Sequence, residues 1–193
     1  MNEQLSKMSD SKIVELSKTE LDIFEELVLR YQERLFRYIK RISYFNNEDA
    51  EDIIQEVFIK AYRNLNDYDD SFKFSTWIYR ITRNCTIDEI RKKHTHPQSM
   101  PLEDEELLKI FKSNINVENE IEIKDHLEKV KKIINDMPFR YKEVLILRFL
   151  EEKSYEEMMD ILRKPKGTVA ALVNRGKKMI AKEAKKQGLY LNQ

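Results

Sequence analysis

The sequence is poor in cysteine, glycine and proline, and these shortages exclude or disfavour particular structural features. The single cysteine, Cys85, cannot form an internal disulfide and fits a reducing cytosol. Only three glycines and four prolines, beside 41% hydrophobic and 36% charged residues, favour a soluble helical protein over a sheet protein. No apolar run approaches the roughly 20 residues of a membrane span, and the polar start, MNEQLSKMSDSK, lacks the apolar segment of a signal peptide. We therefore expect a cytoplasmic protein.

Motifs of catalysis and cofactor binding are missing as well. The sequence contains no glycine-rich phosphate loop and no G-x-S-x-G nucleophile motif. Two of its three histidines, His94 and His96, lie in a proline-bounded loop and with Cys85 would form only a partial zinc site, because no fourth ligand is evident. We predict a protein that is not an enzyme, with no catalytic residues, no cofactor, no metal and no small-molecule substrate.

Helical periodicity and polar interruptions divide the chain into two helical blocks, so the predicted fold class is all-α. Apolar residues recur at helical spacing from about residue 19 to 91, and again from about residue 120 onward. The segment between them is acidic and contains Pro97 and Pro101, which indicates a flexible linker with room for a short helix at 102–111. The predicted organisation is an N-terminal extension (1–18), a first domain (19–95), a linker (96–119) and a second domain (120–193).

A net charge of zero hides an uneven distribution. Residues 1–95 carry 16 basic and 18 acidic side chains, whereas residues 96–130 carry 4 and 9 and residues 131–193 carry 15 and 8. Nine basic residues and one acid, Glu183, lie between Arg163 and Lys186. A basic block of this kind is typical of a surface that binds phosphates. The alternative is a lysine-rich solvated tail.

The strongest local pattern in the second block is SYEEMMDILRKPKGTVAALVNRGKKMI. Ser154 and Glu157 form an S-x-x-E capping box at the start of a short helix. A tight turn and a second helix follow, with an apolar ridge on one face and a basic outer face. Two short helices joined in this way are typical of a helix-turn-helix, although a plain helical hairpin has the same outline. The ridge comprises Val169, Leu172, Val173, Gly176 and Ile180, and the outer face comprises Ala171, Asn174, Arg175, Lys178 and Lys182.

In the first block, the segment DAEDIIQEVFIKAY predicts an amphipathic helix with an unusual outer face. Asp52, Gln55, Glu56, Ile59 and Tyr62 fall on one side of a helical wheel. Apolar and aromatic anchors within an acidic ring indicate a protein interface. Scattered exposed apolar residues are also normal on any surface, so the composition alone leaves both interpretations open.

The stretch FSTWIYRITRN interleaves aromatic and basic residues. Arg80, Arg83, Asn84 and Arg91 share one arc of the predicted helix, and Trp77 borders it. A basic ridge beside an indole offers phosphate contacts and a stacking surface for an unpaired base. The alternative is a core tryptophan with arginines extending past it into solvent.

Together, in order and spacing, three segments resemble bacterial RNA polymerase sigma factors of the extracytoplasmic-function (ECF) group. They are DAEDIIQEVFIKAY, FSTWIYRITRNCTIDEIRKK and RYKEVLILRFLEEKSYEEMMDIL with the following GTV, and the resemblance covers about 24–93 and 130–182. It implies a sigma domain 2, a linker and a sigma domain 4. It also implies transcription initiation in a stress response, with core RNA polymerase, promoter DNA and an anti-sigma factor as partners.

The resemblance assigns roles residue by residue. Contacts with core polymerase, at the clamp of the largest subunit and the flap, would involve Asp52, Gln55, Glu56, Phe58, Ile59 and Tyr62 on the clamp side. Engagement of the −10 element, where this family captures an unpaired base, would involve the loop 64–73 and Lys73, Trp77, Arg80, Arg83, Asn84, Arg91 and Lys92. Recognition of the −35 element in the major groove would involve Arg163, Lys164, Lys166, Thr168, Ala171, Asn174, Arg175 and Lys178. The acidic linker would run toward the RNA exit path.

The sequence departs from the family in the second helix of the helix-turn-helix. Where the family often has G-T-V-K-S-R, this chain has GTVAAL, so Ala170, Ala171 and Leu172 replace a lysine, a serine and an arginine. Arg163 stands where the turn often has glycine. We expect altered −35 preference and a larger share of the binding from the remaining basic residues. A stand-alone helix-turn-helix regulator is the main alternative function, and a protein-binding adaptor is a weaker one because it leaves the basic block unexplained.

Overall fold

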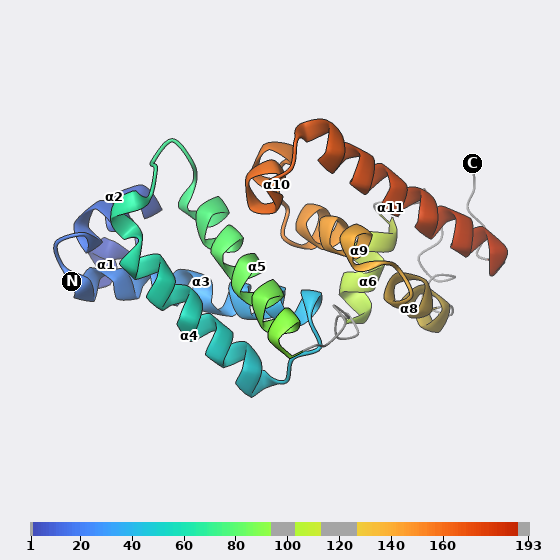
Figure 1. Ribbon diagram of the computed structural model, residues 1–193, viewed down its shortest axis with the longest axis horizontal. Coiled ribbons are helices and arrows are strands. Elements are labelled where there is room, and N and C mark those ends of the chain that lie inside the picture. The colour runs from blue at the N-terminus through green and yellow to red at the C-terminus, as the bar shows by residue number, and fades with distance from the viewer. Residues whose placement is uncertain (1, 94–102, 113–126, 189–193) are drawn as a thin grey trace. The chain divides into compact units, whose positions relative to one another are not determined.

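The computed structural model describes residues 2–93, 103–112 and 127–188, and every regular element in these ranges is a helix (Figure 1). This confirms the all-α prediction. The chain forms two compact units, one made of Met1–Lys40 and Phe45–His96 and the other of Arg41–Tyr44 and Pro97–Gln193.

The first unit is built around one long helix, α3, whose buried stripe includes Leu27, Leu35 and Ile39. An exposed polar face lies opposite this stripe, as the helical spacing of its apolar residues requires. Helices α4 and α5 pack against each other and complete the core. The elements are α1 (Asn2–Leu5), α2 (Asp10–Ser17), α3 (Leu21–Ile42), α4 (Asn47–Arg63), a short 3₁₀ turn η1 (Leu65–Asp67) and α5 (Phe74–Lys92).

The N-terminal extension is part of the folded first unit. The Arg30 guanidinium on α3 donates hydrogen bonds to the backbone carbonyls of Leu5 (2.7 Å) and Met8 (2.9 Å) and pairs with Asp10 (2.8 Å). The Tyr31 hydroxyl also donates to Asp10, and that carboxylate, together with burial as the larger cause, raises the pKa of Tyr31. Charged hydrogen bonds of this kind are the strong ones, so α1 and α2 are fixed to α3.

An aromatic cluster joins α3, α5 and the loop between α4 and α5. The Phe74 ring contacts Tyr31, Tyr68 and Trp77, with centroid separations of 5.4 Å, 5.9 Å and 5.6 Å. The Tyr68 and Trp77 rings meet edge to face at 5.4 Å. Edge-to-face pairs add to the stabilisation from burial, so the cluster holds the loop against the start of α5.

The second unit surrounds helix α9, whose residues from Tyr141 to Leu145 are all buried. A π-helical turn, η2, continues α9, and the Glu151 amide donates to the Ile146 carbonyl at 3.0 Å. The burial of these consecutive residues of α9 explains why the segment has more apolar side chains than one stripe of a helix can hold. The elements are α6 (Asp104–Lys112), α8 (Leu127–Asn135), α9 (Phe139–Leu145), η2 (Ile146–Leu150), α10 (Tyr155–Leu162) and α11 (Lys166–Lys186).

Part of the predicted linker is an ordered helix of the second unit. Helix α6 packs against α8 and η2, and its Leu107 and Ile110 side chains are fully buried. The short helix expected at 102–111 is therefore present, but its middle serves as core, which a purely flexible tether would not do. The rest of the predicted linker lies largely outside the described residues.

Candidate nucleic-acid and protein interfaces

Helices α10 and α11 form the helix-turn-helix that the sequence predicts. The Glu157 amide donates to Ser154 Oγ at 3.1 Å, and the Ser154 amide donates back to Glu157 Oε2 at 2.8 Å, so the capping box is complete. Helix α10 ends at Leu162, and the next residue, Arg163, adopts the left-handed conformation with φ 52° and ψ 50°. The Lys164 amide then donates to the Met159 carbonyl at 3.1 Å and closes the turn.

Helix α11 separates its apolar and basic faces cleanly. Val169, Val173, Gly176 and Ile180 are buried, and Leu172 is half-buried. The opposite face is solvent-exposed from Ala171 to Lys182. Each residue predicted to contact the −35 element is exposed, in the turn or on this face: Arg163, Lys164, Lys166, Thr168, Ala171, Asn174, Arg175 and Lys178.

One ion pair ties the first turn of α11 to the first turn of α10. Lys166 Nζ lies 2.8 Å from Glu156 Oε1, and this contact raises the pKa of Lys166 and lowers that of Glu156. Both side chains are largely solvated, so the pair contributes little to stability. The remaining basic residues of the turn give this end of α11 a positive surface.

Helix α4 begins at a side-chain cap and presents the predicted acidic face. The Asp49 amide donates to Asn46 Oδ1 at 2.7 Å. Asp52, Gln55, Ile59 and Tyr62 are exposed, and Ile59 and Tyr62 expose 50% and 38% of their surface. An exposed apolar side chain and an exposed aromatic one therefore lie within the charged face that the sequence predicts.

Two residues assigned to interfaces by the resemblance are mainly packing residues. Phe58 is 8% exposed and meets Phe24 edge to face at 6.3 Å. Trp77 is also 8% exposed, within the aromatic cluster of Tyr68 and Phe74. The indole is therefore no open stacking platform, and the core alternative describes it better. Phe58 and Trp77 position the neighbouring surface.

An edge of Trp77 nevertheless borders a groove between α4 and α5. The groove has a volume of about 280 Å³ and is lined by Lys60, Asn64, Trp77, Ile81, Asn84 and Cys85. Lys60 Nζ lies 2.7 Å from Glu56 and 3.5 Å from Cys85 Sγ. Burial raises the pKa of the Cys85 thiol, which Lys60 partly opposes. Cys85 is thus a buried thiol in the lining of the groove.

The other residues predicted to engage the −10 element lie around this groove or along α5. Lys73, Asn84, Arg91 and Lys92 are exposed, whereas Arg80 and Arg83 are half-buried. Arg91 and Lys92 pair with Asp88 and Glu89 on the same helix at 3.3 Å. Helix α5 therefore carries a basic side with an amide, Asn84, in its middle.

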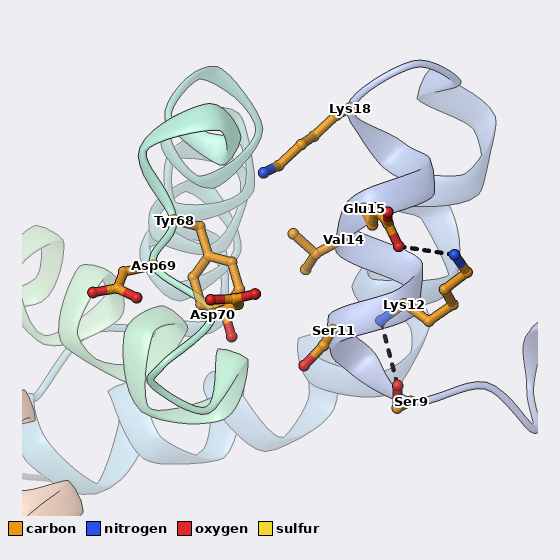
Figure 2. A pocket seen from close by; sticks show the side chains of 9 residues that line it. All are labelled: Ser9, Ser11, Lys12, Val14, Glu15, Lys18, Tyr68, Asp69 and Asp70. Atoms are coloured by element: carbon orange, nitrogen blue, oxygen red, sulfur yellow. Dashed lines mark hydrogen bonds and ion pairs between the residues drawn. The ribbon is translucent and has the colours of Figure 1, made fainter.

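A second cavity, which the sequence did not reveal, lies between α2 and the loop that follows η1. Its volume is about 640 Å³. Figure 2 shows Ser11, Val14 and Lys18 pointing from α2 toward Tyr68 and Asp70 of the loop. The sequence signals for α2 are a capping serine, Ser9, and the adjacent apolar residues Ile13 and Val14. Ser9 Oγ accepts a hydrogen bond from the Lys12 amide at 3.3 Å.

Within the described ranges, no group of three or more His, Cys, Asp or Glu side chains is placed to hold a metal ion. His94 and His96, the other members of the partial zinc site considered from the sequence, lie outside these ranges. Among the helices that the structure describes, none is long and apolar enough to cross a bilayer.

Comparison with known proteins agrees with this geometry. Residues 27–95 match the family model "Sigma-70 region 2" and residues 127–180 match "Sigma-70, region 4". The ECF RNA polymerase sigma factor SigW of Bacillus subtilis is 31% identical over 184 residues, covering 93% of this chain and 98% of that protein. The ECF sigma-E factor of Escherichia coli K12 is 32% identical over 186 residues, covering 93% and 95%.

Solved structures show the same fold. The structure of CnrH in complex with the cytosolic domain of CnrY has a TM-score of 0.62 at 18% identity and covers 89% of this chain and 94% of that one. The sigma factor RpoE in complex with the anti-sigma factor NepR, from Bartonella quintana, has a TM-score of 0.58 at 19% identity, covering 84% and 96%.

A helical unit matching region 2 and a helix-turn-helix unit matching region 4 define a sigma factor of two domains. The chain belongs to the ECF family of RNA polymerase sigma factors. It binds core RNA polymerase and promoter DNA and directs the polymerase to promoters, as the sequence predicted. This function also decides against the stand-alone regulator.

Proposed function

We propose that each of the three surfaces described above has a separate binding role in transcription initiation. The outer face of α4 docks on the clamp of the largest polymerase subunit, and the loop 64–73 with α5 engages the −10 element. The turn and outer face of α11 bind the −35 element, and the second unit also contacts the flap. The protein works in the cytoplasm as an initiation factor without catalytic residues of its own.

The exposed pair Ile59 and Tyr62 carries the polymerase part of this proposal. Apolar and aromatic side chains surrounded by Asp52, Gln55 and Glu56 match the composition of interface hot spots, in which a few central residues carry most of the binding energy. The Tyr62 ring is also held in place by Phe24, with a centroid separation of 5.3 Å. A pre-positioned aromatic loses little conformational entropy on binding.

The test is binding of the full chain to purified core polymerase. Replacing Ile59 by Ala should weaken the affinity by about tenfold or more, as expected for a hot spot of at least roughly 1.4 kcal/mol. Leu29→Ala is the matched control, because Leu29 is 56% exposed on α3, outside the proposed surface. Equal effects of the two substitutions would refute the assignment of the α4 face.

We further propose an anti-sigma factor as a regulatory partner. Among solved structures with this fold, CnrH is in complex with the cytosolic domain of CnrY, and the sigma factor RpoE of Bartonella quintana is in complex with the anti-sigma factor NepR. The exposed apolar residues on α4 provide a surface that such a partner would cover. Purification of the tagged protein from cells under non-inducing conditions, followed by competition with core polymerase, tests this.

A further inference from the structure

We propose that the last two turns of α11 form a phosphate-binding site of their own, in which Lys182 and Lys185 contact the backbone of the duplex beside the −35 element. These turns follow residue 180, where the match to the region 4 family model ends. The contacts are independent of base sequence and fall on phosphates that flank the bases read by the start of α11. The inference rests on the proposed −35 role of α11 and adds a second contact region to it.

The last turns of α11 are packed on the second unit and do not form a solvated tail. Ile180 and Ala184 are both 0% exposed, and α11 packs against α8. The Lys129 ammonium on α8 donates a hydrogen bond to the backbone carbonyl of Gln187, directly after the end of α11, at 3.2 Å. Figure 1 shows α11 as one unbroken helix. Side chains on the solvent face of these turns therefore project from a fixed backbone.

Four basic residues form a stripe along the solvent face of α11, within an arc of about 80° at 100° per residue. The members of this basic stripe are Arg175, Lys178, Lys182 and Lys185, and all four are exposed. None of them has an ion-pair partner among the residues that the structure describes. The one acidic residue of α11, Glu183, lies off the stripe and pairs with Lys186 at 2.7 Å. The stripe is therefore a line of uncompensated positive charge.

The outer face of α11 has an uncharged middle between two basic ends. Residues 167–174 include no charged side chain, and Ala171 and Asn174 are exposed there. Side chains of this kind suit base edges, since asparagine pairs with adenine and an alanine methyl group contacts the methyl group of thymine. The basic turn precedes this middle part and the basic stripe follows it. The order along the helix thus places base contacts between two sets of phosphate contacts.

The length of α11 brings the end of the basic stripe to the wall of the major groove. A helix rises about 1.5 Å per residue, so Lys185 lies about 15 Å beyond Arg175 along the axis. The major groove is about 12 Å wide, and a helix whose first turns lie among the bases therefore reaches the sugar-phosphate backbone with its last turns. In homeodomains the C-terminal end of the recognition helix also contacts the backbone. Lys182 and Lys185 accordingly meet phosphates and not base edges.

The experiment uses holoenzyme reconstituted from core polymerase and the full chain. The probe is promoter DNA in which single phosphates within and on both sides of the −35 element are replaced by uncharged methylphosphonates. With the wild-type protein, neutralising a contacted flanking phosphate should weaken binding by about two- to fivefold, the scale of one exposed ion pair. Lys182→Ala and Lys185→Ala should each cause a similar loss on unmodified DNA. Each variant should also become insensitive to neutralisation of the phosphate that its lysine contacts.

Salt dependence gives a second measurement of the same contacts. Each substitution should lower the salt slope by about 0.9, the value for one phosphate of B-DNA, and the double variant by about twice that. The losses should be equal on two promoters with different −35 sequences, because phosphate contacts carry no sequence information directly. Lys132→Ala is the matched control: it removes an exposed lysine from α8 of the same unit and should leave the phosphate pattern and the slope unchanged. Circular dichroism verifies that each variant is folded.

The outcomes separate this inference from the proposed function on which it rests. If no phosphate beside the −35 element is sensitive, or if Lys182→Ala and Lys185→Ala behave like Lys132→Ala, the second contact region is refuted while the −35 role of α11 stands. Weaker binding to core polymerase in these variants, with promoter contacts unchanged, would assign the lysines to a protein contact and would also refute it. If base changes within the −35 element do not alter binding of the wild-type holoenzyme, the −35 role itself fails.

Discussion

Gly176 of α11 lies directly against Leu145 of α9. A Cβ atom built on Gly176 would be 3.2 Å from Leu145 Cδ1 and 3.3 Å from Leu145 Cγ, closer than ordinary van der Waals contact. This close approach seats the recognition helix on the core of the second unit. Glycine in the middle of a helix costs roughly 1 kcal/mol of stability relative to alanine. Here the absence of a Cβ atom is what allows the two helices to pack this closely.

Replacing Gly176 by Val should therefore lower the free energy of unfolding by about 1–3 kcal/mol, the usual cost of overpacking. Gly167→Val offers a matched control on the same helix, because no atom lies within 4 Å of a Cβ at that position. That control should be neutral or slightly stabilising, since valine is a better helix former than glycine. Urea denaturation of both variants measures the difference, and equal destabilisation would contradict the packing role of Gly176.

Arg163 combines an unfavourable backbone conformation with an exposed charge. A non-glycine residue in the left-handed region costs about 1–2 kcal/mol, so Arg163→Gly should raise the free energy of unfolding by about 1 kcal/mol while it weakens −35 binding. Arg163→Ala keeps the backbone cost and removes only the charge. We expect it to lose DNA affinity to the same extent without gaining stability. Thermal unfolding and −35 duplex titrations distinguish the two; a stability gain in both variants would refute the backbone explanation.

Lys142 is buried on α9, 4% exposed, with Nζ 3.0 Å from Asn135 Oδ1. Burial lowers its pKa from 10.5 to about 8. Between these two values the unfolded chain binds more protons than the folded chain, so this group makes the protein more stable as pH rises from 8 to 10.5. Below pH 8 the lysine is charged in both states and its desolvation cost is fully present.

Lys142→Met should consequently be more stable than the wild type at pH 7, by an amount on the order of 2 kcal/mol, and this advantage should shrink toward pH 10. The measurement is the difference in free energy of unfolding between variant and wild type across pH 6.5–10, taken from urea titrations. Lys132→Met, an exposed lysine on α8, provides the comparison and should give a flat difference. A flat profile for Lys142→Met would show that the buried ammonium is not destabilised.

Lys178 lies exposed on the outer face of α11, where a phosphate contact would serve every sequence alike. Lys178→Ala should weaken binding to all −35 duplexes by a similar factor and reduce the salt slope by about one. Titrations of several duplexes at a series of salt concentrations with the full chain measure both quantities. A change confined to the preferred −35 sequence would instead assign Lys178 to base readout.

The sequence predicts most reliably what local interactions decide. The Ser154–Glu157 capping box and the two faces of α11 were predicted because each depends on neighbours within a few residues. At the start of α3 local spacing is less decisive: the Thr19 hydroxyl donates to the Leu16 carbonyl at the end of α2, and α3 begins only at Leu21. A threonine between two helices has two helix ends within reach, and spacing alone does not choose between them.

Tertiary packing decides the features that the sequence did not predict. On a helical wheel Trp77 lies at the border of the basic arc, but the loop residue Tyr68 folds over it, and no periodicity predicts that contact. The left-handed conformation of Arg163 was equally hidden, because an arginine carries none of the signal that a glycine would. The cavity between α2 and the loop depends on Arg30 reaching back over 20 residues to Asp10, which only the folded chain reveals.

The attachment of α2 to α3 also bears on how this protein is divided for biochemical study. A fragment that starts at residue 27, where the family match begins, would lack α1 and α2, which pack against α3. It would leave the Arg30 guanidinium without Asp10 and the carbonyls that it binds, and would bare the apolar surface beneath Ile13 and Val14. Such a truncation would be prone to self-association, so fragments meant to isolate the polymerase-binding half should keep the first turns of the chain.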